Sequence, residues 1–311
     1  MNVLSLFNGI SCGRLALERS NINVDNYYSS EIDKYTLKIA DKNYPEDIKN
    51  KLGDIKNINC FDLPNIDLLI GGSPCVNFSF SGKQKGMITD QDIEILSLEQ
   101  YLELKDNGFE FKGYSYLFWE YMRILKETKP KYFLLENVKM SKKWENILSQ
   151  AIGIEPIKIN SSLVSAQNRI RNYWTNIPNI TQPKDRNIIL EDILEYDTSK
   201  IEPFKNCVRK NIVNIDVLQY LKGSGFCQIP TSSGFQDHKV GITKSPCLRA
   251  GNSFVLVKCP NGGIRKITVL ECERLQTIPD NFTEGISNTQ RFKAIGNGWT
   301  VDVISHIFNH I

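Results

Sequence analysis

Short apolar runs alternate with amphipathic stretches through the first half of the chain. Runs of this length are typical of buried strands, and we expect strands at 2–6, 27–31, 66–70, 132–136 and 157–160. Between them, apolar residues recur at helical spacing, which predicts helices near 12–19, 34–43, 116–129 and 142–152. Strict alternation of strand and helix favours an α/β fold with a doubly wound, mostly parallel sheet, whose ligands bind beyond the carboxyl ends of the strands.

The alternation stops at about residue 178 and does not return before about residue 265. This stretch is rich in Asn, Ser, Gly and Lys and contains short β-prone pieces, which indicates a smaller, irregular, loop-built domain. Helical spacing reappears at 268–275 and at 300–308, and we expect the last segment to pack back on the first domain. The predicted domains are therefore 1–178 plus 284–311, and 179–283.

Composition and charge narrow the class of protein only slightly. The chain has 311 residues, of which 41% are hydrophobic and 23% charged, as in an ordinary globular protein. The net charge of +3 permits a nucleic-acid partner but does not indicate one. No basic leader or long apolar stretch suggests export or a membrane span, and the eight cysteines lack the paired spacing of a zinc site. We expect free thiols in a reducing cytoplasm, no membrane and no metal.

One cysteine stands at a place suited to a nucleophile. Cys75 ends the sequence Gly71-Gly72-Ser73-Pro74-Cys75, directly after the apolar run at 66–70. We expect the Gly-Gly pair to break the strand and the loop to present the thiol at the ligand-binding edge. A lone cysteine is more often a small buried hydrophobe, but the proline before it and the polar loop after it favour an activatable thiolate.

Two further groups follow neighbouring predicted strands. Glu136 ends the apolar run at 132–136, and Arg169 and Arg171 alternate along a third strand, so they should share one face. The acid can equally be an ordinary turn residue, and the arginines a solvated basic strand. Together with a nucleophilic sulfur, however, a carboxyl group and two guanidiniums suit attack on an electron-poor ring.

A glycine-containing turn, Phe7-Asn8-Gly9-Ile10-Ser11, links the first strand to the first helix. Glu31 lies about twenty residues further on, which suits ribose hydroxyls, and Asp54, near a third strand end, suits an adenine amino group. Such turns also serve helix packing. The glycine pattern is too sparse for a pyrophosphate, so a nucleoside cofactor without phosphates is the better interpretation.

Six motifs in order resemble those of the DNA (cytosine-5) methyltransferase family over nearly the whole chain. They are Phe7-Asn8-Gly9-Ile10, Gly72-Ser73-Pro74-Cys75, Glu136-Asn137-Val138, Gln167 to Arg171, Arg265 to Gln276, and Gly296-Asn297-Gly298. Ser11-Cys12, Val76 and Trp299 depart from the commonest family pattern, and the Ser-Pro-Cys and Gly-x-Trp forms are similar to the animal de novo branch. The segment 89–112 has no assigned role.

The resemblance implies S-adenosylmethionine as the methyl donor and a flipped cytosine in duplex DNA as the substrate. Catalytic residues would be Cys75, which adds to carbon 6, Glu136, which protonates nitrogen 3, and Arg169 and Arg171, one of which would bind the base. The donor would be bound by Phe7, Gly9, Ser11, Glu31, Ile32, Asp54, Ile55, Pro74, Leu117, Asn297 and Trp299. DNA contacts would include Ser81, Lys83, Gln84, Lys85 and Arg249, the last within a target recognition domain at 179–283.

The same resemblance implies a monomer on double-stranded DNA, with a restriction endonuclease as a possible counterpart. One subgroup of the family acts on transfer RNA, so a tRNA cytosine-5 methyltransferase stays open as an alternative. A catalytically silent DNA-binding regulator is a second alternative, although it predicts the loss of a nucleophile or acid that this chain retains. A dinucleotide oxidoreductase would leave Cys75 and the arginines without a role.

Overall fold

The computed structural model of the chain describes residues 1–75, 77–78, 86–195, 225–229, 239–241, 243–250, 254–258 and 264–311. The chain forms two compact units. The first comprises Met1–Ile159, Ile170–Thr181 and Ser305–Ile311, and the second comprises Asn160–Arg169 and Gln182–Ile304. These units are defined by compactness, whereas the predicted domains, 1–178 plus 284–311 and a target recognition domain at 179–283, are defined by function. The predicted division stays a prediction.

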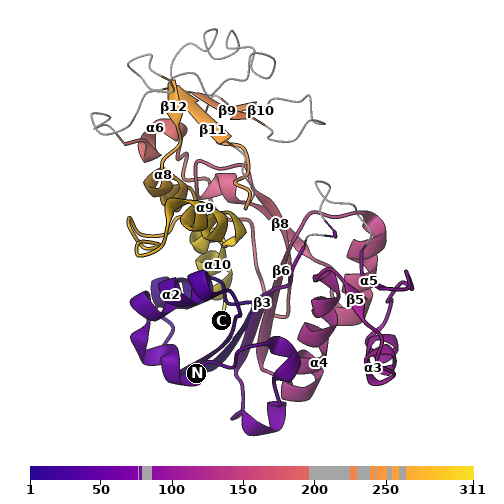
Figure 1. Cartoon of the computed structure of the whole chain (residues 1–311). Coiled ribbons are helices and arrows are strands. Elements are labelled where there is room, and N and C mark those ends of the chain that lie inside the picture. The colour runs from indigo at the N-terminus through magenta and orange to yellow at the C-terminus, as the bar shows by residue number, and fades with distance from the viewer. Residues whose placement is uncertain are drawn as a thin grey trace. The chain divides into compact units, whose positions relative to one another are not determined.

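The central sheet of the first unit has six strands in the order β2-β1-β3-β6-β8-β7 (Figure 1). They are β1 (Asn2–Leu6), β2 (Asn26–Ser30), β3 (Leu68–Gly72), β6 (Tyr132–Val138), β7 (Ile157–Asn160) and β8 (Ile170–Thr175). The first four pair in parallel, whereas β8 runs antiparallel to β6. The predicted doubly wound, mostly parallel sheet is confirmed. Strand order reverses between β1 and β3, where ligands of this fold bind.

Helices lie between these strands where the apolar spacing predicts them. They are α1 (Cys12–Arg19), α2 (Lys34–Asn43), α4 (Phe118–Thr128) and α5 (Lys142–Ile152), with short 3-10 turns η1 (Pro45–Asn50), η2 (Ile55–Asn57), η3 (Cys60–Asp62) and η4 (Ser115–Leu117). The α4 helix begins two residues later than predicted because η4 precedes it. The end of α10 (Val301–Phe308) packs on the first unit as expected, with the Ser305 and Ser20 hydroxyls 2.9 Å apart.

The prediction that Gly71 and Gly72 break the third strand is wrong. Strand β3 continues through both, and Gly72 pairs with Glu136 on β6. A β-carbon at Gly71 would lie 3.1 Å from the Leu6 carbonyl oxygen and 3.1 Å from the Tyr121 ring. Close packing of β1 and α4 against β3, rather than a turn, therefore explains this glycine.

The segment without an assigned role forms a small structure of its own. Its two-stranded antiparallel sheet consists of β4 (Ile88–Thr89) and β5 (Phe111–Lys112), joined through helix α3 (Leu98–Asp106). The Ser97 hydroxyl caps α3 by accepting a hydrogen bond from the Gln100 amide. Residues 88–113 are named the β4–β5 segment below.

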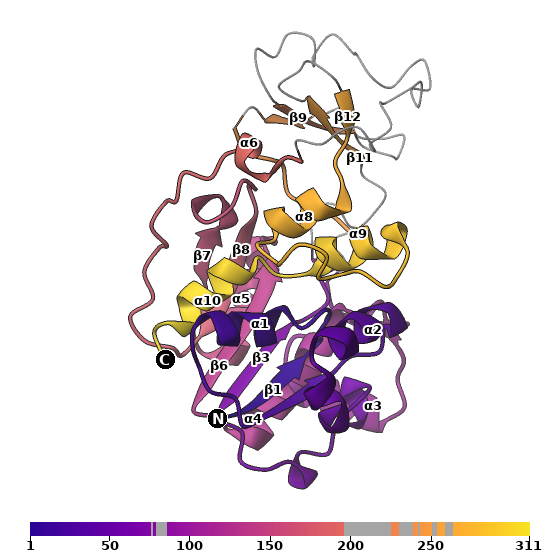
Figure 2. The same cartoon turned by 90° about the vertical axis from the view of Figure 1, so that its left-hand side faces the viewer.

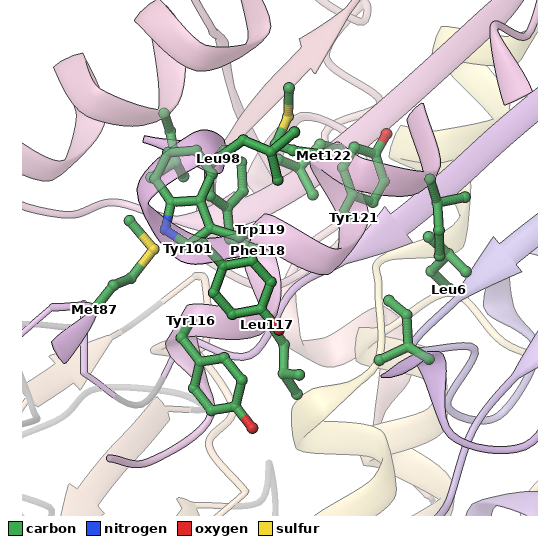
Figure 3. Packing of buried hydrophobic residues seen from close by; sticks show 14 of the residues in the cluster. Leu6, Met87, Leu98, Tyr101, Tyr116, Leu117, Phe118, Trp119, Tyr121 and Met122 are labelled. Carbon is green, nitrogen blue, oxygen red and sulfur yellow. The ribbon is translucent and has the colours of Figure 1, made fainter. Parts of the chain in front are cut away.

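The core beside β3 is built mainly from aromatic side chains of η4 and α4 (Figure 3). Phe118, Trp119 and Tyr121 are fully buried there. Met87, just before β4, and Tyr101 of α3 belong to the same cluster. Burying one such side chain contributes roughly 1.5–3 kcal/mol relative to exposure, so this cluster fixes α4 and the β4–β5 segment on the sheet.

Two buried tyrosines of this core should respond oppositely to loss of the hydroxyl group. The Tyr121 hydroxyl has no hydrogen-bond partner among the described residues, whereas that of Tyr101 donates to the Glu120 carboxylate at 2.6 Å. We expect Tyr121→Phe to raise the free energy of unfolding by up to about 1 kcal/mol, and Tyr101→Phe to lower it by about 1.5–3 kcal/mol. Urea titration of both variants measures this, and equal destabilisation would contradict it.

The second unit carries a four-stranded antiparallel sheet in the order β10-β9-β11-β12. Its described elements are η5 (Ser161–Leu163), α6 (Leu190–Ile193), β9 (Gly225–Ile229), β10 (Lys239–Gly241), β11 (Phe254–Lys258), β12 (Ile264–Lys266), α8 (Val269–Leu275) and α9 (Asn288–Asn297). The predicted helix at 268–275 is confirmed, and Thr268 and Glu271 form its capping box. Helices α8 and α9 lie side by side (Figure 2).

Candidate active site

Cys75 and Glu136 are brought to one edge of the sheet by the pairing of β3 with β6. Gly72 is the register partner of Glu136, so the chain from Ser73 to Cys75 leaves the sheet beside the end of β6. The Asn137 side-chain amide, 1% exposed, donates to the Ser73 carbonyl at 3.1 Å and to the Ser73 hydroxyl at 2.9 Å. Asn137 therefore ties the segment that carries the thiol to the strand that carries the carboxyl group. Cys75 carries a thiol rather than a disulfide and is half-buried.

Arg171 fixes the orientation of the Glu136 carboxylate. Its Nε lies 3.0 Å from Glu136 Oε1, and the two side chains are only 13% and 11% exposed. Arg171 is opposite Val138 on the antiparallel strand, so it is a diagonal neighbour of Glu136 on the same face of the sheet. A guanidinium at this distance compensates the desolvation of the carboxylate and holds it in one direction.

Arg169 does not share this face, so that prediction is wrong. Strand β8 begins at Ile170, and the Arg169 amide instead donates to the Asn160 side chain at 2.9 Å. The strand alternation on which the prediction rests does not reach Arg169. Its guanidinium, buried in the second unit, donates to the carbonyl oxygens of Leu248, Gly296 and Gly298 at 2.9 to 3.1 Å.

The turn after β1 is held by the side chain of Asn8. The Asn8 Oδ1 accepts from the hydroxyls of Ser5 and Tyr27, each at 2.9 Å, and its Nδ2 donates to the Ser11 hydroxyl at 2.8 Å. Phe7, Gly9 and Ser11 all have left-handed backbone angles, with φ of 56°, 55° and 64°. These bonds offset the strain of two non-glycine residues in that region.

Glu31 closes the same turn from the end of β2. One carboxylate oxygen accepts from the Gly9 amide at 2.8 Å, and the other accepts from the amides of Ile32 and Asp33 at 2.7 and 2.9 Å. The Ile32 side chain beside it is 66% exposed, an apolar surface next to a carboxylate. A ring that lies on Ile32 and hydroxyls that bond Glu31 would suit a nucleoside.

Asp54 does not follow a third strand. It caps η2, where its carboxylate accepts from the Lys56 amide at 3.0 Å, and Lys51 joins the preceding chain to Ser29 of β2 by an isolated bridge. Burial raises the pKa of the Tyr116 hydroxyl, and the charges of Lys56 and Asp54 also act on it. Tyr116, which precedes the buried Leu117, is not among the site residues that the sequence predicts.

The remaining predicted site residues lie elsewhere or outside the described part of the chain. Pro74 precedes Cys75 and Ile55 is buried in η2, both in the first unit. Asn297 ends α9, Trp299 follows it, and Arg249 is exposed, all in the second unit. Ser81, Lys83, Gln84 and Lys85 lie outside the described residues. The roles of all these residues stay predictions.

Two findings hold for the described residues only. In the ranges that the structure covers, no group of three or more His, Cys, Asp or Glu side chains could hold a metal ion. Among the described helices, none is long and apolar enough to cross a bilayer.

A doubly wound sheet whose first turn is bonded to a carboxylate at the end of the second strand is the architecture of α/β proteins that bind nucleoside-containing ligands where the strand order reverses. The model of the C-5 cytosine-specific DNA methylase family matches residues 1–153 and 158–311. The chain belongs to this family of DNA (cytosine-5) methyltransferases, which confirms the resemblance seen in its motifs.

Known proteins agree with this assignment along the whole chain. The type II methyltransferase M1.ScrFI of Lactococcus lactis subsp. cremoris is 29% identical over 98% of this chain and 76% of its own length. M.HhaI, a type II methyltransferase of Haemophilus parahaemolyticus, is 28% identical over 100% of this chain and 94% of its own length. Solved structures of the Entamoeba histolytica methyltransferase EhMeth and of S. pombe Dnmt2 share the fold, with TM-scores of 0.61 and 0.58. Sequence identities are 19% and 17%, with 100% and 99% of this chain and 97% of each solved chain covered.

Proposed function

We propose that this protein methylates carbon 5 of a cytosine rotated out of duplex DNA, through a covalent bond between the base and Cys75. The observation that carries the proposal is the meeting of the Cys75 segment and Glu136 at adjacent strand ends, with Arg171 3.0 Å from the Glu136 carboxylate. These three groups supply a nucleophile, a proton donor and a fixed positive charge. The names of the type II relatives favour DNA as the substrate.

Cys75 begins the reaction by forming a bond between its thiolate sulfur and carbon 6 of the cytosine. Glu136 enters this step as the neutral acid and donates its proton to nitrogen 3, so that electron density collects on carbon 5 rather than on the ring nitrogen, and the carboxylate that results is the form that Arg171 holds. Carbon 5 then takes a methyl group, whose bond to the sulfur of the donor would break as the new carbon–carbon bond forms, and nitrogen 3 returns its proton to Glu136. Water takes the proton on carbon 5, and the electron pair of that bond forms the double bond between carbons 5 and 6 as the bond to sulfur breaks and the Cys75 thiolate leaves.

Residues of the first unit fit the methyl donor that this family uses. S-adenosylmethionine supplies a methyl group on a positively charged sulfur, which is an electrophile for carbon 5. Glu31 offers carboxylate oxygens for ribose hydroxyls, Asp54 offers an acceptor for an adenine amino group, and exposed Ile32 offers an apolar face for the ring. Phe7, Gly9 and Ser11 belong to the turn after β1. Pro74, Ile55 and Leu117 are the other residues of the first unit that we propose to bind the donor.

The two arginines receive different roles in this proposal. Arg171 holds the Glu136 carboxylate and therefore acts at the reacting base. Arg169, whose guanidinium is bonded to three backbone carbonyls of the second unit, is a positioning residue for the segment that contains Asn297. The assignment of Arg169 as a catalytic residue is thereby replaced by a positioning role.

Duplex DNA is the proposed partner because the family model and the type II relatives are named for DNA methylation. Carbon 6 of a stacked cytosine is inaccessible, so the base must be rotated out of the duplex. Extruding the base costs a few kcal/mol, which contacts in the pocket must offset. The second unit would read the sequence, with Arg249 and the loop residues Ser81, Lys83, Gln84 and Lys85 contacting DNA. A monomer bound to its site, and a restriction endonuclease as counterpart, complete the proposal.

Labelled methyl donor tests the substrate directly. We expect the purified protein to transfer label to unmethylated genomic DNA, and the labelled base recovered after hydrolysis to be 5-methylcytosine. Total tRNA serves as a competitor and as a separate substrate. Label in tRNA alone would favour the tRNA methyltransferase, and no label in either would favour a silent DNA-binding regulator. Bisulfite sequencing of a plasmid from an expressing host then gives the recognition sequence.

A further inference from the structure

The β4–β5 segment is fixed rigidly to the core of the first unit. Tyr101 and Lys105 of α3 both bond Glu120, a fully buried residue of α4, at 2.6 Å. At the other end of the segment, the Phe111 ring stacks on the Tyr116 ring with centroids 4.7 Å apart. An ion pair with a buried carboxylate and a stacked aromatic pair give the segment one defined place.

The C-terminal end of the β4–β5 segment contacts Asn77, which follows Cys75 by two residues. Asn77, two residues after Cys75, donates its amide to the Ser115 hydroxyl at 3.1 Å and its side-chain Nδ2 to the Lys112 carbonyl at 3.5 Å. The Asn77 carbonyl accepts from the Gly86 amide at 3.0 Å. Asn77 is therefore held by η4 through its backbone amide and by the end of β5 through its side chain.

Gly113 leaves just enough space for the Asn77 side chain. A β-carbon at Gly113 would lie 2.6 Å from Asn77 Nδ2, closer than real β-carbons approach a neighbouring atom. Gly113 also has a left-handed φ of 69°. Gly108, in the same segment, has a similar φ of 77°, but a β-carbon there would meet no atom within 4 Å, so a substitution at Gly108 has similar backbone strain without the contact with Asn77.

We propose that Asn77 is a positioning residue for Cys75, and that the β4–β5 segment acts on the reaction through it. On the N-terminal side of Cys75, Asn137 holds Ser73 by hydrogen bonds. On the C-terminal side, Asn77 is held by hydrogen bonds to Ser115 and Lys112. The thiol between these two anchors is thus set against the end of β6. This inference rests on the proposed function, because it assumes that Cys75 attacks the base.

The test compares Gly113→Ala with Gly108→Ala. Because both place a side chain at a left-handed φ, the backbone strain is shared and the difference isolates the contact with Asn77. We expect Gly113→Ala to lower kcat at saturating DNA and donor about tenfold or more, since a displacement of about 1 Å costs up to about 100-fold. The KM for the methyl donor should change less than about twofold, and Gly108→Ala should match the unmodified protein, because neither touches the donor site.

A double variant separates a contact effect from general damage. With Asn77→Ala in place, the side chain that Gly113→Ala displaces is gone, so the double variant should have the kcat of Asn77→Ala alone. Independent, additive losses would overturn the inference. So would equal kcat values for the two glycine variants.

Trapping with 5-fluorocytosine in duplex DNA tells the two failures apart. If the unmodified protein forms no covalent complex in the presence of the donor, the proposed function fails and the inference fails with it. If the unmodified protein is trapped and Gly113→Ala is trapped at the same rate as Gly108→Ala, only the role of Asn77 fails. We expect slower trapping of Gly113→Ala.

Discussion

Replacing Cys75 with serine should lower methyl transfer by at least about 10³-fold, because a hydroxyl of high pKa replaces the thiolate that forms the bond to carbon 6. The variant should also form no covalent complex with DNA that contains 5-fluorocytosine. Binding of the methyl donor should persist, because the residues of the β1 turn and Glu31 are untouched. A filter assay with labelled donor, and a denaturing gel of the trapped complex, measure both effects.

Cys60→Ser is the matched control for this experiment. Cys60 is a free, half-buried cysteine of the same unit. Burial and a hydrogen bond with Glu127 raise the pKa of its thiol to about 12, so it stays protonated and unreactive at neutral pH. We expect the activity of Cys60→Ser to match that of the unmodified protein. If Cys75→Ser transfers methyl groups at the normal rate, Cys75 is not the nucleophile and the proposed mechanism is wrong.

Replacing Glu136 with glutamine should lower kcat by about 10²- to 10⁴-fold, the usual contribution of general acid catalysis. The amide has the shape of the carboxyl group but cannot donate an acidic proton to nitrogen 3. After proton transfer, the variant also lacks the negative charge that the Arg171 guanidinium, only 13% exposed, would face at 3.0 Å. Single-turnover transfer of labelled methyl groups, with enzyme in excess over DNA, reports this step.

Glu145→Gln tests whether loss of a buried carboxylate alone explains such a result. Glu145 is 4% exposed and pairs with Lys142 and Lys158, each at 3.1 Å, in the same unit. Burial raises the pKa of Glu145, but the two lysines outweigh it and the net pKa is lowered. Its contribution to stability is therefore present above the unfolded pKa and is lost as pH falls through the lowered value. We expect this variant to lose stability at neutral pH but to keep its single-turnover rate, and equal losses of rate in both variants would contradict the role of Glu136.

Much of the sheet could be predicted from the sequence because local patterns determine it. Strand and helix alternate with clear periods over the first unit, and helix capping residues such as Asp33 lie where such residues are expected. Cys75 and Glu136 could be placed at one edge since the carboxyl ends of parallel strands meet there. The exact register, in which Gly72 pairs with Glu136, comes from the structure.

Residues whose roles depend on contacts between distant segments could not be predicted. Arg169 precedes β8, and its guanidinium donates to the Gly296 carbonyl within the second unit. The alternation of side chains along a strand cannot predict such a contact. Strands β4 and β5 have two residues each, too few to show a period. The Asn77 backbone amide donates a hydrogen bond to the Ser115 hydroxyl, and the Asn137 side chain donates one to the Ser73 hydroxyl. A sequence does not show which distant group accepts such a hydrogen bond.

The turn after β1 has a thermodynamic consequence for ligand affinity. Asn8 and Glu31 already lock the left-handed backbone of Phe7, Gly9 and Ser11 through hydrogen bonds within the protein itself. The conformational entropy of this turn is therefore lost when the protein folds, whereas a flexible loop would lose it when the ligand binds. A small molecule that docks against a preorganised surface of this kind loses little of its binding free energy to ordering the protein, and the amide protons of the turn should exchange slowly with solvent even in the free enzyme.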